Sequence, residues 1–171
     1  FKQIKDNTCQ LIAIQTVLSY YNIYYTLKDI KKKLPKHSYG NLITELGIYL
    51  ESEGIKTKII TNKASIRENN KQFRITLEEY RKIGIYEDRE IIQEDITNTP
   101  IIVNVDRNKI VKEDERKVGH YVVINKENDI IKLYDGRNYN NVIDISYKDI
   151  LESSKYTNRW KDDGMFLITY S

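Results

Sequence analysis

The order of the hydrophobic patterns along this chain constrains its fold more than any other feature of the sequence. Residues 9–54 carry apolar side chains at helical spacing, whereas a series of short alternating runs between residues 100 and 170 is typical of strands. Helical patterns that come first and strands that follow, without regular alternation, favour an α+β domain. We therefore expect N-terminal helices packed on an antiparallel β-sheet.

Three helices are expected in the first part of the chain. The first, residues 9–21 (CQLIAIQTVLSYY), is apolar on nearly every face, as in a helix buried on most sides. The second and third, residues 26–34 and 41–54, each carry an apolar stripe, and Gly54 is a candidate C-terminal cap. A helix-rich N-terminal half is therefore predicted.

The rest of the chain has strand patterns after a charged stretch. Residues 61–98 are mostly polar, with helical candidates at 77–83 and 89–96, and we interpret them as a charged insertion into a single domain that spans residues 1–171. A short helix is expected at 147–154. Strands are expected at residues 56–60, 100–105, 119–125, 129–136, 142–146 and 164–170.

Composition excludes several classes of protein. The single cysteine cannot form an internal disulfide, and the net charge of +3 is mixed along the chain, which argues against a nucleic-acid partner. No apolar run reaches the ~18–20 residues that span a bilayer, and the first residues of the chain lack the charged start and apolar stretch of a secretion signal, so we expect a soluble segment without membrane insertion. The start at Phe1 suggests a processed or excised domain, and the localisation stays unknown.

His120 and Asp135 are the most informative pair in the sequence. If residues 126–129 form the turn between two strands, His120 lies directly opposite Asp135, on the same face of the sheet. A carboxylate there would hold one ring nitrogen of the histidine protonated and leave the other free to act as a base.

Cys9 stands at the start of the first predicted helix, with Asn7 and Thr8 as candidate N-caps. The positive end of the helix dipole favours a thiolate there. Gln3, in the preceding loop, has a side-chain amide that would join the Cys9 backbone N–H as donors to an oxyanion. Nucleophile, base, orienting carboxylate and oxyanion donor are the roles that a thiol hydrolase requires.

Each of these residues also has a structural interpretation. A lone cysteine in an apolar helix is commonly core filler, and a lone histidine can be a satisfied core residue. Asp135 with Gly136 is also an ordinary turn signal. The catalytic hypothesis depends on their occurring together.

The sequence resembles a known family in several separated segments. Gln3 and Cys9 at a helix start, a Leu-rich helix that ends at Gly54, and the motifs GHYVVI and LYDG occur in the order found in the bacteriocin-processing, double-glycine-leader peptidases and their stand-alone relatives. That family belongs to the papain-like cysteine peptidases. The resemblance covers residues 1–60 and 99–170, and Trp160 fits the stand-alone relatives as a packing residue.

The resemblance implies a papain-like fold and a set of residue roles. Cys9 would be the nucleophile, His120 the general base and acid, Asp135 the residue that orients His120, and Gln3 the oxyanion-hole donor. The family commonly has Gly after its cysteine and Pro after its aspartate, whereas this chain has Gln10 and Gly136. Gln10 would crowd the backbone beside the nucleophile.

Other signals have ordinary explanations. His37 lies in a loop with no second histidine or cysteine at metal-ligand spacing, so no metal site is expected. Asp162 and Asp163 are adjacent and are interpreted as a solvated turn. The 14 tyrosines are surrounded by mixed charge and are expected to pack with their hydroxyls near water.

The sequence therefore predicts a cysteine peptidase that needs no cofactor and cleaves a peptide or amide bond through an acyl-enzyme on Cys9. The expected partner is a peptide or protein substrate bound extended in a cleft, with a neighbouring transporter or another domain outside this chain left open. Two alternatives stay open: an acyl or amide transferase on the same scaffold, and a catalytically silent peptide-binding domain.

Overall fold

The computed structural model describes residues 9–36, 41–62, 71–106, 119–136, 142–155 and 164–170. Helices and strands occur in the predicted order, helices first. The helices are α1 (Cys9–Tyr20), α2 (Leu27–Lys33), α3 (Ile43–Ser52), α4 (Lys71–Arg81), the short 3₁₀ helix η2 (Gln93–Asp95) and α6 (Tyr147–Ser154). The strands are β1 (Lys56–Thr61), β2 (Ile85–Asp88), β3 (Ile101–Asp106), β4 (Gly119–Glu127), β5 (Ile130–Tyr134), β6 (Val142–Ile145) and β7 (Phe166–Tyr170).

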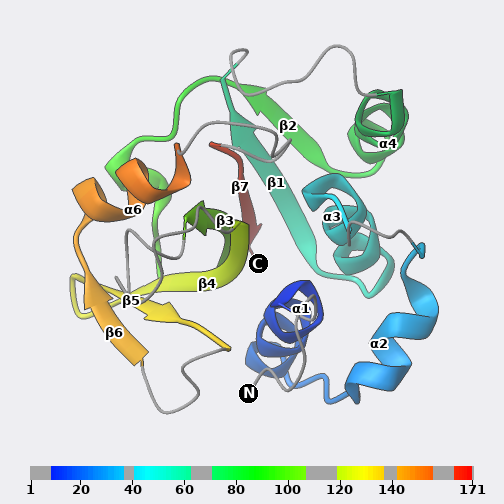
Figure 1. The fold of residues 1–171 in the computed structure, drawn as a ribbon, viewed down its shortest axis with the longest axis horizontal. Helices are drawn as coiled ribbons and strands as arrows, with labels where there is room; N and C mark the ends of the chain where they lie inside the picture. The colour runs from blue at the N-terminus through cyan, green and yellow to red at the C-terminus, as the bar shows by residue number, and fades with distance from the viewer. Residues whose placement is uncertain are drawn as a thin grey trace.

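The seven described strands form one curved sheet in the order β2-β1-β7-β3-β4-β5-β6 (Figure 1). Neighbouring strands are antiparallel except for β1 and β2, which run parallel. The predicted α+β class with helices packed on an antiparallel sheet is therefore confirmed, with one parallel pair at the edge.

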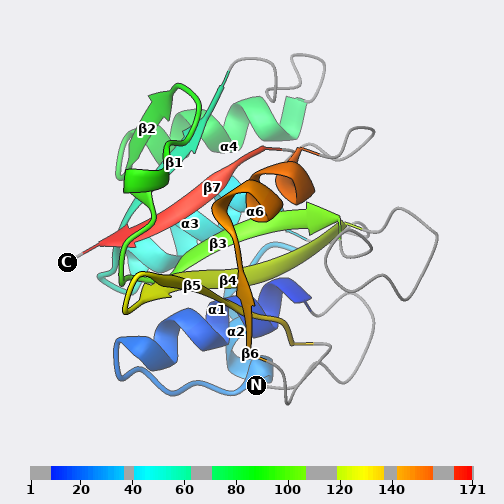
Figure 2. The same ribbon diagram turned by 90° about the vertical axis from the view of Figure 1, so that its left-hand side faces the viewer.

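Two hydrophobic cores lie on the two faces of the sheet. Helices α1, α2, α3 and α4 cover one face, where Ile14, Leu46 and Tyr80 are fully buried. Helix α6 covers the other face, where Ile150 packs against residues of β3, β4 and β7 such as Val103. Figure 2 shows α1 and α6 on opposite sides of the sheet. The continuous apolar runs of the central strands follow from burial on both faces.

The N-terminal helices match the sequence predictions closely. Most side chains of α1 are buried, as its nearly uniform hydrophobicity indicated. Helix α2 has a capping box in which Thr26 and Asp29 each satisfy a backbone N–H of the other. Helix α3 ends before Gly54, whose φ of 84° is in the left-handed region that favours glycine, so the predicted C-terminal cap is confirmed.

Predictions for residues 77–96 were partly wrong. The helix expected at 77–83 is the longer α4, which ends at Arg81, and the helix expected at 89–96 is reduced to η2. Strand β2 was not predicted at all. It pairs with β1 at the sheet edge, and its four residues carry a pattern too short to be recognised from periodicity. That residues 61–98 are an insertion into a single domain over residues 1–171 stays a prediction.

The predicted pairing of β4 and β5 was wrong by two residues. Ile124 lies opposite Leu133 and Glu127 opposite Ile130, rather than Ile124 opposite Ile131. The reason is the turn: Asn128 and Asp129 both have positive φ, 51° and 66°, and make a two-residue hairpin loop instead of the expected four-residue one. A shift of two residues keeps every side chain on its predicted face, because the side-chain period of a strand is two.

Candidate active site

Cys9 is the first residue of α1 and is partly buried against the core that the N-terminal helices share with the sheet. Backbone N–H groups of a first helical turn have no partners within the helix, and they give this end a partial positive charge. The thiol donates a hydrogen bond to Oε1 of the neighbouring Gln10 over 3.4 Å. The nucleophile candidate thus stands at a helix N-terminus, and Gln10, which was expected from the sequence to crowd the backbone, is a polar partner of its thiol.

His120 and Asp135 are in direct contact in the buried interior. Nε2 of His120 and Oδ1 of Asp135 lie 2.6 Å apart, and the two side chains are 2% and 4% exposed. His120 lies near the start of β4, and Asp135 follows the last residue of β5. Because the register is shifted, Asp135 lies diagonal to His120 rather than directly opposite, but on the same face, as predicted.

The electrostatics of His120 also involve Cys9. Burial alone lowers the pKa of the imidazole, but its hydrogen bonds with Asp135 and with the Cys9 side chain outweigh that effect and raise the pKa from 6.5 to about 9. Cys9 is therefore near enough to act on the ring. The fold brings together three side chains from α1, β4 and the end of β5.

Several predicted residues lie outside the described parts of the chain. Gln3, the predicted oxyanion donor, is one of them. The others are Asn7, Thr8, His37, Trp160, Asp162 and Asp163. The assignments made for them from sequence stay predictions.

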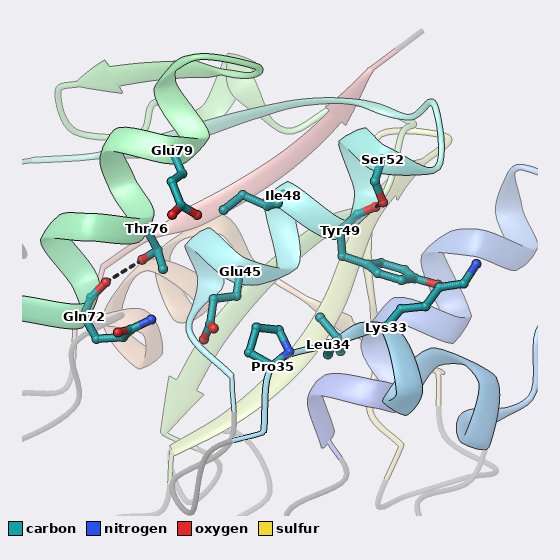
Figure 3. A pocket seen from close by; sticks show the side chains of 10 residues that line it. All are labelled: Lys33, Leu34, Pro35, Glu45, Ile48, Tyr49, Ser52, Gln72, Thr76 and Glu79. Carbon is teal, nitrogen blue, oxygen red and sulfur yellow. Dashed lines mark hydrogen bonds between the residues drawn. The ribbon is translucent and has the colours of Figure 1, made fainter.

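A cavity of about 490 Å³ lies on the helical half, between α2, α3 and α4 (Figure 3). Its lining includes the apolar residues Leu34, Pro35 and Ile48 and polar side chains such as Gln72 and Glu79. None of the described candidate catalytic residues lines it. The cavity is therefore separate from the Cys9–His120–Asp135 cluster.

Among the described residues, no three His, Cys, Asp or Glu side chains gather closely enough to hold a metal ion. In the same parts of the chain, no helix has the length and apolar character needed to cross a bilayer.

Comparison with known proteins relates part of this sequence to a family of peptidases. The sequence model of the Peptidase C39 family matches residues 1–83, which include Cys9. No curated protein matches the chain. The resemblance to this family, expected from the motifs, is confirmed over that range.

Among solved structures, the chain is similar to the peptidase domain of Streptococcus ComA, described as a bi-functional ABC transporter involved in a quorum sensing pathway. The match has a TM-score of 0.58 at 15% identity and covers 98% of this chain and 94% of that one. The predicted fold is thus confirmed over almost the whole chain. Together, the family match and the fold support a cysteine peptidase.

Proposed function

We propose that this chain, which resembles the Peptidase C39 family and has the fold of a peptidase domain, hydrolyses a peptide bond with Cys9 as nucleophile, His120 as general base and acid, and Asp135 as the residue that orients His120. The observation that carries the proposal is the buried 2.6 Å contact between His120 and Asp135, together with the influence of Cys9 on the same imidazole. A buried carboxylate–imidazole pair beside a thiol at a helix start supplies the nucleophile, base and orienting group that a thiol hydrolase requires.

The two nitrogens of His120 have different tasks in this proposal. Nε2 is engaged by Asp135, so Nδ1 is the nitrogen that takes the proton from the Cys9 thiol. The sulfur then attacks the substrate carbonyl carbon, and Nδ1 returns the proton to the leaving amine as the C–N bond breaks. A water that gives its proton to Nδ1 attacks the thioester, which releases the acid and restores the thiol.

The raised pKa of His120 suits this sequence of steps. At neutral pH a ring with a pKa of about 9 is protonated in the resting site, and a protonated ring next to sulfur favours the thiolate. Asp135 stabilises that charged ring without leaving its position. Gln3, whose side-chain amide precedes Cys9 by a short segment, completes the proposal as donor to the oxyanion.

The substrate we propose is a peptide bound in extended form between the helical half and the sheet. The similar ComA domain is part of an ABC transporter, so a peptide destined for export, cut after a double-glycine leader, is the substrate class that this resemblance supports. A transporter, encoded with this chain or separately, is the corresponding partner.

The test is digestion of a peptide library that includes double-glycine sequences, read by mass spectrometry. Wild-type protein is expected to produce new termini, and Cys9→Ala none, because Cys9 is the only cysteine in the chain. Cleavage by both proteins would identify a contaminant and refute the proposal. Amide products that form only when an amine is added would instead favour an acyl transferase on the same scaffold.

A further inference from the structure

Gln10 is the second polar neighbour of the Cys9 thiol. Its Oε1 accepts the thiol hydrogen over 3.4 Å, and the residue is only 7% exposed. Helix α1 holds both residues in its first turn. A buried amide group can form few hydrogen bonds with water. The orientation of an amide that contacts sulfur therefore depends on whether the sulfur carries a proton.

We propose that Gln10 is a positioning residue for the nucleophile, holding the thiol with its amide oxygen and the thiolate with its amide N–H₂ group. The inference rests on the proposed function, because it concerns the proton that passes from Cys9 to Nδ1 of His120. It adds a residue at the position after the cysteine, where the sequence departs from the glycine common in the family it resembles.

The chemistry of the amide group supports two arrangements. While sulfur is protonated it can donate, and Gln10 Oε1 is its acceptor. After the proton moves to His120, sulfur can only accept, and an amide oxygen facing it is repelled. A half-turn about the last side-chain bond, whose torsion is broad and roughly two-fold because it joins an sp³ to an sp² atom, replaces the oxygen with N–H donors.

Substitutions of similar size can test this role of Gln10, because they differ from glutamine in the hydrogen bonds that they offer to the sulfur. Glutamate has nearly the same shape and can accept from the thiol, but it offers no donor to a thiolate and brings a negative charge next to it. Methionine has similar length and offers neither group in useful strength. Of these three side chains, only glutamine serves both protonation states of the sulfur.

The experiment measures how fast iodoacetamide alkylates the native protein across a range of pH, with the modified residue identified by mass. For Gln10→Glu, the pH of half-maximal rate is expected to rise by about one unit or more, which is a tenfold or greater loss of rate at pH values below both midpoints. His120 and Asp135 surround the same sulfur in every variant, so their contribution is common to all curves.

Gln15→Glu is the matched control. Gln15 lies on the same helix, is partly buried, and donates from Nε2 to the Tyr25 carbonyl at 3.0 Å, away from the thiol. The Gln15→Glu variant should be less stable than wild type, but its alkylation curve should not shift. A shift of equal size in both variants would indicate a general effect on α1 and would overturn the inference.

Gln10→Met covers the case in which Gln10→Glu does not fold. It introduces no charge, so its curve is expected to shift in the same direction by a smaller amount. An unchanged curve in folded Gln10→Met, or in folded Gln10→Glu, overturns the inference while leaving the proposed function intact. Failure of the proposed function has a different signature: in that case wild-type Cys9 itself is not alkylated in the native state.

Discussion

At the scale of single residues, the buried His120–Asp135 pair decides what the site can do. A histidine buried to this degree without a partner would favour its neutral form, yet here the pKa is raised to about 9. The pair is also the part of the site that sequence reasoning predicted best. The 2.6 Å contact forms although the predicted register was wrong by two residues. Side chains of this length can meet diagonally across two strands as long as both point to the same face of the sheet.

Substitution of Asp135 separates orientation from charge. In Asp135→Asn, the amide oxygen can still accept from Nε2, so peptide cleavage is expected to fall about tenfold, through loss of the charge that stabilises the protonated ring. In Asp135→Ala, orientation is lost too, and a fall of about 10²-fold or more is expected. Cleavage rates of the library peptides measure both.

The matched control for Asp135→Asn is Asp129→Asn. Asp129 is on the β4–β5 hairpin turn with an almost fully exposed side chain, and asparagine tolerates its positive φ. It should cleave at the wild-type rate. Equal rates for Asp135→Ala and wild type would show that the carboxylate has no part in catalysis.

The raised pKa of His120 also predicts how stability depends on pH. Between pH 6.5 and about 9 the folded protein binds a proton at His120 that the unfolded chain releases, so the free energy of unfolding falls as the pH rises through this range. The contribution is complete below 6.5 and lost above about 9. Urea unfolding at several pH values should show this slope in wild type.

His120→Gln removes the titrating group and is expected to abolish most of that slope. If the slope of this variant equals that of wild type, another group causes it, and the electrostatic description of His120 given above is wrong.

At the scale of elements, glycine positions show how closely α3 and α4 pack. A Cβ added at Gly47 of α3 would lie 2.6 Å from Cε1 of Tyr80, which is fully buried on α4. The hydroxyl of Tyr80 is held by Thr57 at 2.8 Å, so the ring cannot easily move away. The sequence showed Gly47 only as a glycine within a helical pattern, and the contact that explains it is between segments far apart in the chain.

Gly47→Ala is therefore expected to destabilise the protein by about 1–3 kcal/mol, although alanine is the better helix former. Chemical denaturation measures the change. Ser52→Ala, at an exposed position of the same helix, should stay within about 0.5 kcal/mol of wild type. Equal stability of Gly47→Ala and wild type would mean that α3 and α4 can separate at little cost.

At the scale of the whole molecule, the segment that follows β2 connects the edge of the sheet to the rest of the domain. The structure of this segment was predicted poorly from the sequence. Arg89 binds Asp95 through two hydrogen bonds, of 2.8 and 2.9 Å, and Glu87 at 2.7 Å. Further along, the hydroxyl of Tyr147 on α6 donates to the Ile91 carbonyl. These contacts replace the helix expected at 89–96, and they depend on partners that no local pattern indicates.

Asp95→Asn tests this connection. The hydrogen bonds from Arg89 lower the pKa of Asp95, so its contribution to stability is present above the ordinary value of 3.8 and is lost as the pH falls below it. We expect a loss of about 1 kcal/mol at neutral pH, limited by the partial exposure of Arg89, and a weaker dependence of stability on pH below 4. Glu94 is an exposed neighbour of Asp95, and Glu94→Gln should change neither the stability at neutral pH nor its dependence on pH below 4.

The sequence predicted local patterns well and tertiary details less well. Helices α1 to α3 and the central strands have periodicities long enough to define them, so their approximate limits could be predicted. The turn at Asn128 and Asp129, the short strand β2 and the contact of Gln10 with sulfur could not, since each is fixed by one or two residues in a particular tertiary setting. The catalytic hypothesis was accessible because chemistry limits which residue types can share one site.

The most direct test of the central claim is the rate at which iodoacetamide modifies Cys9 in the native protein, compared between wild type and His120→Ala at neutral pH. If His120 takes the proton from Cys9, wild type should react readily and His120→Ala at least about tenfold more slowly, with the fold of both verified by circular dichroism. Modification of wild-type Cys9 only after denaturation, or at the same rate in both folded proteins, would contradict the account.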